Sequence, residues 1–197
     1  DNVYADAKED AQVIQRCYET LSKKPGFRQL RSQGQHMATW DDHDFGTNDS
    51  GRHYPLKRQS QTLFVDFWQL QDVIPSGRDG IYYSRMFQSG KHRLQVIMLD
   101  VRFFRDDPDE DADVLGEAQW KWLAEQLRAP ADLRMIVSGF QLLLPADAAS
   151  ETWAKFPAAR KRLFKTIRDS LAERVVFITG DQHYGEVCRK RGVLDFD

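Results

Sequence analysis

The densest set of chemically active side chains lies between Thr39 and Asp49. Carboxylates, an imidazole and an amide occur here within a few positions, at Asp41, Asp42, His43, Asp44, Asn48 and Asp49. Like charges this close repel one another, which raises their pKa values and destabilises a fold unless a cation or several hydrogen-bond donors compensate. The run therefore predicts a metal site, and a solvated acidic loop is the alternative.

A second carboxylate and imidazole follow another apolar run, residues 175–178. Asp181 and His183 are two positions apart, so one short turn can direct both toward the same ion, and this donor pair suits zinc, iron or manganese. Alone the motif is weak, because a single histidine is more often structural. Two such groups, each after an apolar run, indicate a metal site more strongly than either group does alone. The amino-terminal Asp1, Tyr4 and Asp6 have the composition of an ordinary terminal loop.

The elements that must position these groups alternate along the chain. Apolar residues at helical spacing predict helices over residues 7–24, 56–70, 115–127 and 158–171. Short apolar runs predict strands over residues 35–40, 94–99, 133–137 and 174–179. This alternation indicates an α/β fold, and the ligand sites of open α/β sheets gather beyond the carboxyl ends of the strands.

The composition excludes several classes of protein. With 197 residues, 41% of them hydrophobic, the chain is predicted to be one globular domain over residues 1–197. A net charge of -2 provides no basic field for nucleic acid, and no run approaches the roughly 18 apolar residues of a membrane-spanning helix. An EF-hand over residues 107–118 is excluded, because Ala112 and Ala118 occupy positions that require Gly and Glu.

Together these motifs resemble the alkaline phosphatase D family, a branch of the calcineurin-like metallophosphoesterases. The most specific part is the block Trp40-Asp41-Asp42-His43-Asp44, and the supporting segments are residues 1–6, 99–102, 115–120 and 180–183. The resemblance covers nearly the whole chain. It implies an α/β fold in which a β-sandwich is flanked by helices (αββα). It also implies that the domain is cropped at both ends, because the first metal motif of the superfamily should lie upstream of Asp1.

The resemblance further implies roles for individual residues. Metal ligands fall on Asp1, Tyr4, Asp42, Asp181 and His183, around two or more ions of iron, calcium, zinc or manganese. His43 is implied as the catalytic imidazole, held by Asp44. Gln141 lies near the position where many relatives carry a ligating histidine.

The activity implied by this resemblance is metal-dependent hydrolysis of phosphate esters, in which a metal-bridged hydroxide attacks phosphorus and His43 acts as the general acid. The sequence leaves open whether the substrate is a phosphomonoester, a phosphodiester or a phospholipid, and leaves the oligomeric state open. The resemblance suggests an exported protein, periplasmic or secreted. The alternative is a noncatalytic metal-binding or structural fragment of such a domain.

Overall fold

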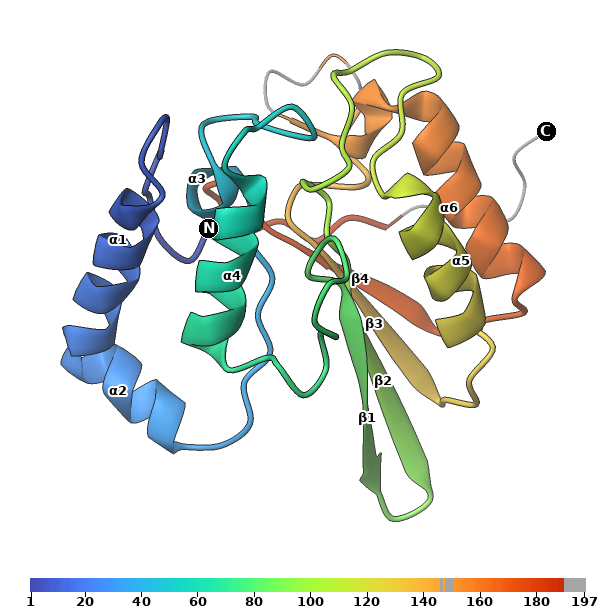
Figure 1. The fold of residues 1–197 in the computed structure, drawn as a ribbon. Helices are drawn as coiled ribbons and strands as arrows, with labels where there is room; N and C mark the ends of the chain where they lie inside the picture. The colour runs from blue at the N-terminus through green and yellow to red at the C-terminus, as the bar shows by residue number, and fades with distance from the viewer. Residues whose placement is uncertain (146, 148–150, 190–197) are drawn as a thin grey trace.

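The computed structural model describes residues 1–145, 147 and 151–189 (Figure 1). The helices in this part of the chain are α1 (Gln12–Lys23), α2 (Pro25–Ser32), α3 (Asp42–Phe45), α4 (Lys57–Trp68), α5 (Gly116–Gln126) and α6 (Pro157–Asp169), with a short 3-10 helix η1 (Trp153–Lys155). The strands are β1 (Tyr83–Ser89), β2 (His92–Met98), β3 (Leu133–Ser138) and β4 (Val175–Thr179). Among these residues, no helix is both long enough and apolar enough to span a membrane.

The strands form one mixed sheet in the order β1-β2-β3-β4. β1 pairs with β2 antiparallel, whereas β2, β3 and β4 run parallel. Parallel neighbours need long crossover connections, and α5 and α6 supply them. The carboxyl ends of β2, β3 and β4 therefore lie at one edge of the sheet, where the acidic motifs were expected.

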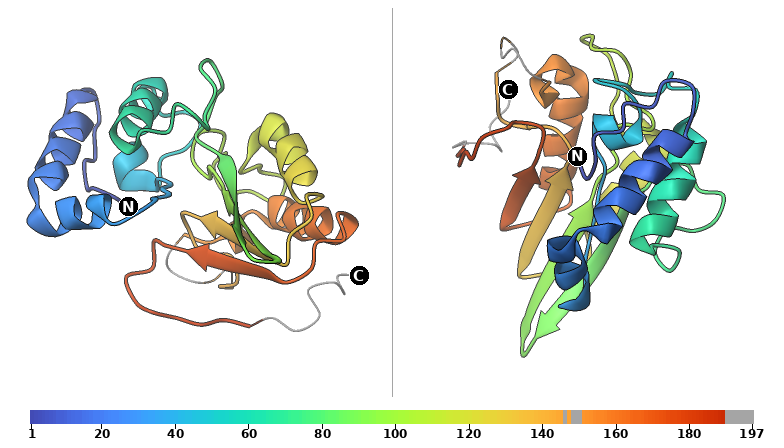
Figure 2. Two further views of the ribbon diagram at one scale, coloured as in Figure 1. Left: turned by 90° about the horizontal axis from the view of Figure 1, so that it is seen from below. Right: turned by 90° about the vertical axis from the view of Figure 1, so that its left-hand side faces the viewer.

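Helices pack against both faces of this sheet, as the views in Figures 1 and 2 show. Ile97 and Ile136 pack with the buried side chains of α5 and α6, while Tyr83 and Met98 pack with those of α1 and α4. The predicted α/β class is confirmed. The described residues contain one sheet of the two that a β-sandwich requires.

The predicted strand over residues 35–40 is wrong, because this segment is extended without a strand partner. Its backbone is satisfied by side chains instead. The Tyr83 hydroxyl bonds both the N–H and the carbonyl of Ala38 (2.9 and 3.2 Å), and Asn2 Nδ2 donates to the carbonyl of Thr39 (2.9 Å). The other three predicted strands correspond to β2, β3 and β4, and the four predicted helices to α1, α4, α5 and α6.

β1 was not predicted from the sequence. Ser89 pairs with His92 across a two-residue turn, in which Gly90 has a φ of 58°. Tight hairpin turns of this kind require positive φ, which glycine adopts without strain. Only Tyr83 is buried along this edge strand, so it lacks the continuous apolar run of its neighbours.

Candidate metal centre

Two glycine turns bring the ends of β3 and β4 to the acidic segment. A Cβ at Gly139 would lie 2.4 Å from Asp41 Oδ1, so only a residue without a side chain fits there. Gly180 donates its N–H to the carbonyl of Gly139 (2.8 Å), which places the following Asp181 beside the same turn.

The acidic segment is an ordered turn because its own carboxylates satisfy its backbone. Asp44 Oδ1 accepts the N–H of Asp41 (2.9 Å). The two oxygens of Asp42 accept the N–H groups of His43 (3.0 Å) and Asp49 (2.8 Å). Asp41, Asp42 and Asp44 are all buried. This burial argues against the solvated acidic loop.

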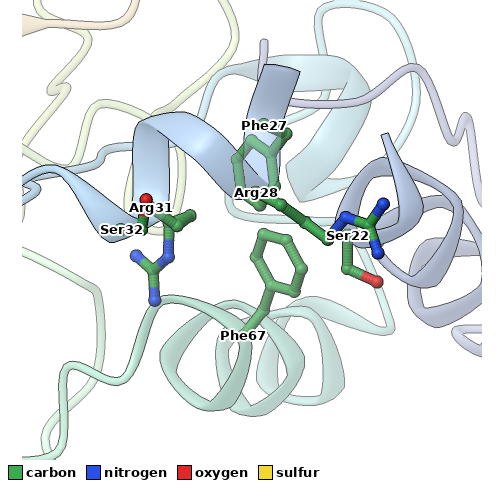
Figure 3. Close-up of a pocket in the computed structure, with 6 residues that line it drawn as sticks. All are labelled: Ser22, Phe27, Arg28, Arg31, Ser32 and Phe67. Atoms are coloured by element: carbon green, nitrogen blue, oxygen red, sulfur yellow. The ribbon is translucent and has the colours of Figure 1, made fainter. Parts of the chain in front are cut away.

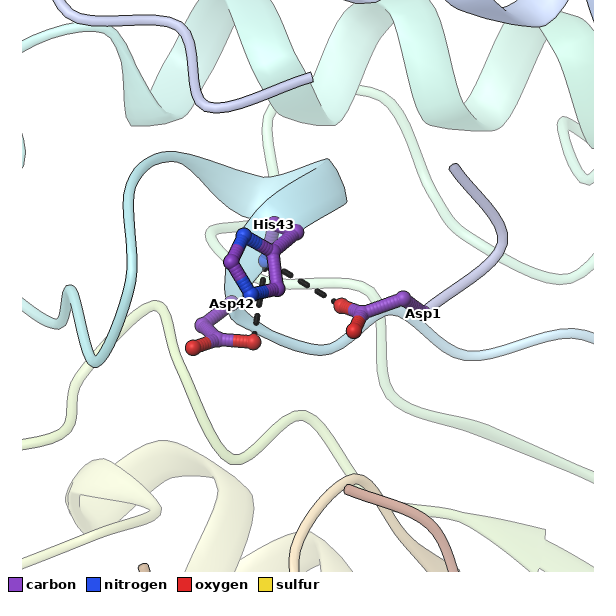
Figure 4. A group of neighbouring side chains, drawn as sticks. All are labelled: Asp1, Asp42 and His43. Atoms are coloured by element: carbon purple, nitrogen blue, oxygen red, sulfur yellow. Dashed lines mark hydrogen bonds between the residues drawn. The ribbon is translucent and has the colours of Figure 1, made fainter. Parts of the chain in front are cut away.

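The ligand atoms of the two motifs converge in two overlapping groups. One group comprises Asp41, Asp42 and Asp181, and the other comprises Asp1, Asp42 and His43; within each, the candidate ligand atoms all lie within 4.8 Å of one another. Figure 4 shows the carboxylates of Asp1 and Asp42 beside His43, whose backbone N–H donates to both (3.1 and 3.0 Å). Asp42 is common to both groups, so its carboxylate joins them.

Tyr4 links the amino-terminal segment to both histidines. Its ring stacks on His43, with centroids 4.3 Å apart, and its hydroxyl lies 2.8 Å from His183 Nε2. Burial raises the pKa of Tyr4, and the negative charges of Asp42 and Asp181 raise it further. The structure thus brings Tyr4 and His183 close to the acidic groups, although His183 itself belongs to neither group in the described part of the chain.

The carboxylate that holds His43 is Asp6, not Asp44 as predicted. His43 Nδ1 lies 2.6 Å from Asp6 Oδ1, and the N–H groups of Ala5 and Asp6 both donate to the carbonyl of His43 (3.1 and 3.2 Å). Asp44 is fully buried elsewhere, where its Oδ2 accepts Asn2 Nδ2 (2.5 Å) and the Tyr18 hydroxyl (3.2 Å). Asp44 therefore fixes the fold of this segment.

Behind the acidic groups lies a buried chain of alternating charges. Arg102 donates from Nε and Nη2 to Asp41 Oδ1 (2.7 and 2.5 Å), and its Nη2 also pairs with Glu151 (2.5 Å). Glu151 in turn pairs with Arg105. All four side chains are almost completely buried. No motif in the sequence indicated Glu151 or Arg105, because their pairing is made by the tertiary fold.

Comparison with known proteins identifies the family. The sequence model of the PhoD-like phosphatases matches residues 7–193. The chain belongs to this family. It is 25% identical over 181 residues to alkaline phosphatase D of Bacillus subtilis (strain 168), a match that covers 75% of this chain and 30% of that protein.

A solved structure, "Structure of PhoD", has a similar fold, with a TM-score of 0.67 and 22% identity. The match covers 88% of this chain and 39% of that one. The predicted resemblance to the alkaline phosphatase D family is thus confirmed. This PhoD-like chain spans between three and four tenths of the length of the relatives it matches.

In this PhoD-like chain, burial and mutual repulsion destabilise the charged acidic groups, and a bound cation would offset both effects. Burial and the negative charge of Asp42 raise the pKa of Asp41 to about 6, although the positive charge of Arg102 opposes this shift. Burial and the charge of Glu151 raise the pKa of Asp181. Burial also acts on Asp42, but Arg102 and donated hydrogen bonds outweigh it and lower its pKa. Asp41 Oδ2 is buried without a hydrogen-bond partner among the described residues. These residues therefore fit a metal ion.

Gln141 is not free to serve as the ligand that its position suggested. Its Oε1 accepts the N–H groups of Leu142 (2.7 Å) and Leu143 (3.1 Å), which closes the turn after β3.

Proposed function

We propose that this chain carries a metal-dependent phosphoester hydrolase site, and that the substrates are phosphomonoesters or phosphodiesters. The observation that supports this most strongly is that Asp42 belongs to two groups of candidate ligand atoms, one shared with Asp1 and His43 and the other shared with Asp41 and Asp181, so that three distant segments meet at Asp42. The family provides the reaction class. The geometry supports it with clustered oxygen ligands and one adjacent, oriented imidazole.

The residues proposed to hold the ions are Asp1, Tyr4, Asp42, Asp181 and His183. Carboxylate oxygens favour calcium or manganese, whereas the phenol and imidazole at the rim suit iron or zinc. Metal ions held there supply an activated water and neutralise the charge of the phosphoryl oxygens. The buried Arg102 keeps Asp41 and Asp42 in place, because it pairs with the first and attracts the second.

His43 is proposed to handle the proton of the leaving group. Because Nδ1–H is directed at Asp6, Nε2 is the ring nitrogen that can give a proton to the departing alkoxide. Stacking on Tyr4 restricts the rotation of the imidazole.

An exported location, periplasmic or secreted, stays a prediction from the family resemblance.

Replacing Asp6 with asparagine is expected to lower kcat about 10- to 100-fold, as loss of an orienting partner typically does. The amide keeps the size of the side chain but cannot stabilise a charged His43. Metal content, measured by atomic emission, should stay unchanged. Asp72→Asn is the matched control, because Asp72 forms an exposed pair with Arg85. An unchanged kcat in Asp6→Asn would contradict the orienting role.

Chelation provides the direct test of the proposed function. Hydrolysis of 4-nitrophenyl phosphate and bis(4-nitrophenyl) phosphate is measured before and after chelation and after readdition of single metals, alongside metal analysis. We expect chelation to abolish turnover and one or more metals to restore it. Turnover that is insensitive to the chelator would contradict a metal mechanism. Bound metal without turnover would support the noncatalytic alternative.

A further inference from the structure

A cavity lies between α1, α2 and α4, apart from the acidic site (Figure 3). Its volume is about 510 Å³, which falls in the range of roughly 300–1,000 Å³ common for small-molecule sites. The residues that line it are Ser22, Phe27, Arg28, Arg31, Ser32 and Phe67. None of them belongs to the two acidic groups.

Two phenylalanine rings form the apolar part of this cavity. Phe27 and Phe67 are stacked, with centroids 5.7 Å apart and ring planes 17° from parallel. Phe67 also stacks on the buried Tyr18, with centroids 4.3 Å apart. The core therefore fixes the ring of Phe67, and Phe67 in turn holds the ring of Phe27 at the cavity.

Arginines stand on two sides of these rings. Figure 3 shows Arg31 on one side of the two phenylalanines and Arg28, with Ser22, on the other. The guanidinium of Arg31 lies 5.2 Å from the centre of the Trp68 ring. In the described part of the chain, neither arginine has a carboxylate partner.

The surrounding charge is also positive. Lys23, Lys24 and the two arginines lie within ten residues of one another, in a chain whose net charge is -2. One carboxylate, Glu19, precedes them on α1 and accepts a hydrogen bond from Gln15 (3.0 Å). Asp66, which precedes Phe67 on α4, accepts a hydrogen bond from Gln71 (3.0 Å) and borders a different cavity. The cavity is thus a local cationic site on a chain of slightly negative net charge.

We propose that this cavity binds an aromatic organic anion, a flat ring that carries a phosphate, sulfonate or carboxylate group. The ring packs against the Phe27–Phe67 pair, and the guanidinium group of Arg28 or of Arg31, on either side of the pair, binds the acidic group through charge-assisted hydrogen bonds. The hydroxyls of Ser22 and Ser32 provide further donors. An inorganic anion would use only the arginines, and an uncharged arene only the rings. Binding here needs no metal and does not depend on the proposed hydrolase activity.

The test is a calorimetric titration of the protein with naphthalene-2-sulfonate in the presence of a chelator. This probe contains no phosphate ester, so hydrolysis cannot consume it. We expect saturable binding, at least tenfold weaker in the Arg28→Ala/Arg31→Ala variant. The control is Lys121→Ala/Arg128→Ala, which removes two exposed cations on and just after α5 and should leave binding unchanged.

Four results would overturn the proposal. They are no saturable binding at millimolar probe, an equal loss in the control variant, equally tight binding of uncharged 2-naphthol, and complete displacement of the probe by an equal concentration of sulfate. Circular dichroism establishes that each variant is folded. Arg28→Gln/Arg31→Gln replaces the alanine variant if the latter melts early, since glutamine keeps most of the side-chain volume.

Discussion

His43→Ala is expected to lower kcat about 10²- to 10⁴-fold, the usual contribution of a general acid, and to leave the metal content nearly unchanged. Asp6 anchors the imidazole through Nδ1, and the N–H groups of Ala5 and Asp6 hold the backbone carbonyl of His43. Its removal therefore deletes a proton donor without unmaking the carboxylate cluster. Phosphate release from an alkyl phosphate such as glycerol 2-phosphate, whose alkoxide leaving group needs a proton, together with metal analysis of the same sample, measures both quantities.

Asp42→Ala is expected to give the opposite pattern, loss of bound metal together with loss of turnover. Asp42 is the one carboxylate shared by both groups of ligand atoms in the described residues. Asp49→Asn is the matched control, because Asp49 lies in the same segment but its side chain is exposed and outside both groups. Metal retained in Asp42→Ala and lost in His43→Ala would reverse the proposed division of roles.

The sequence predicted those elements whose pattern is local. α1, α4, α5, α6 and the three parallel strands each carry their own apolar periodicity, which burial against the sheet or helices requires. Residues 35–40 show the limit of that reasoning. They contain the buried Ala38 and Trp40, but the partner of the backbone at Ala38 is a tyrosine hydroxyl. An apolar run indicates that a segment is buried, but it does not indicate which groups form hydrogen bonds with the backbone of that segment.

The residues of the candidate site also differ in whether the sequence alone could predict their positions. Asp42 and Asp181 could be expected to meet, because each follows an apolar segment predicted to be a strand. The structure brings them together, although residues 35–40 do not form a strand. Their roles as ligands stay predictions. The link between Asp6 and His43 could not be predicted, because the composition of the first residues is that of a loop. Glu151 likewise could not be predicted, because its pairing with Arg102 and its effect on Asp181 arise only in the tertiary fold.

The chain of charges behind the site makes Arg102 the residue whose loss should most weaken the fold. Arg102→Met keeps an unbranched side chain of similar length but leaves Asp41 and Glu151 buried without their shared cation. Removing one partner of a buried ion pair typically costs about 3–5 kcal/mol of unfolding free energy. Denaturation in urea, at neutral pH and with a chelator present, measures that loss independently of bound metal.

An exposed pair provides the control for this experiment. Arg162 pairs with Glu117 at the surface (2.9 Å), and Arg162→Met should cost no more than about 1 kcal/mol. Adding Asp41→Asn to Arg102→Met should recover part of the lost stability, because it removes the buried charge that pairs with Arg102, whereas Glu151 keeps its pair with Arg105. A loss below about 1 kcal/mol in Arg102→Met would mean that Asp41 and Glu151 take up protons at little cost. The carboxylates of the site would then be held by their backbone hydrogen bonds and not by Arg102.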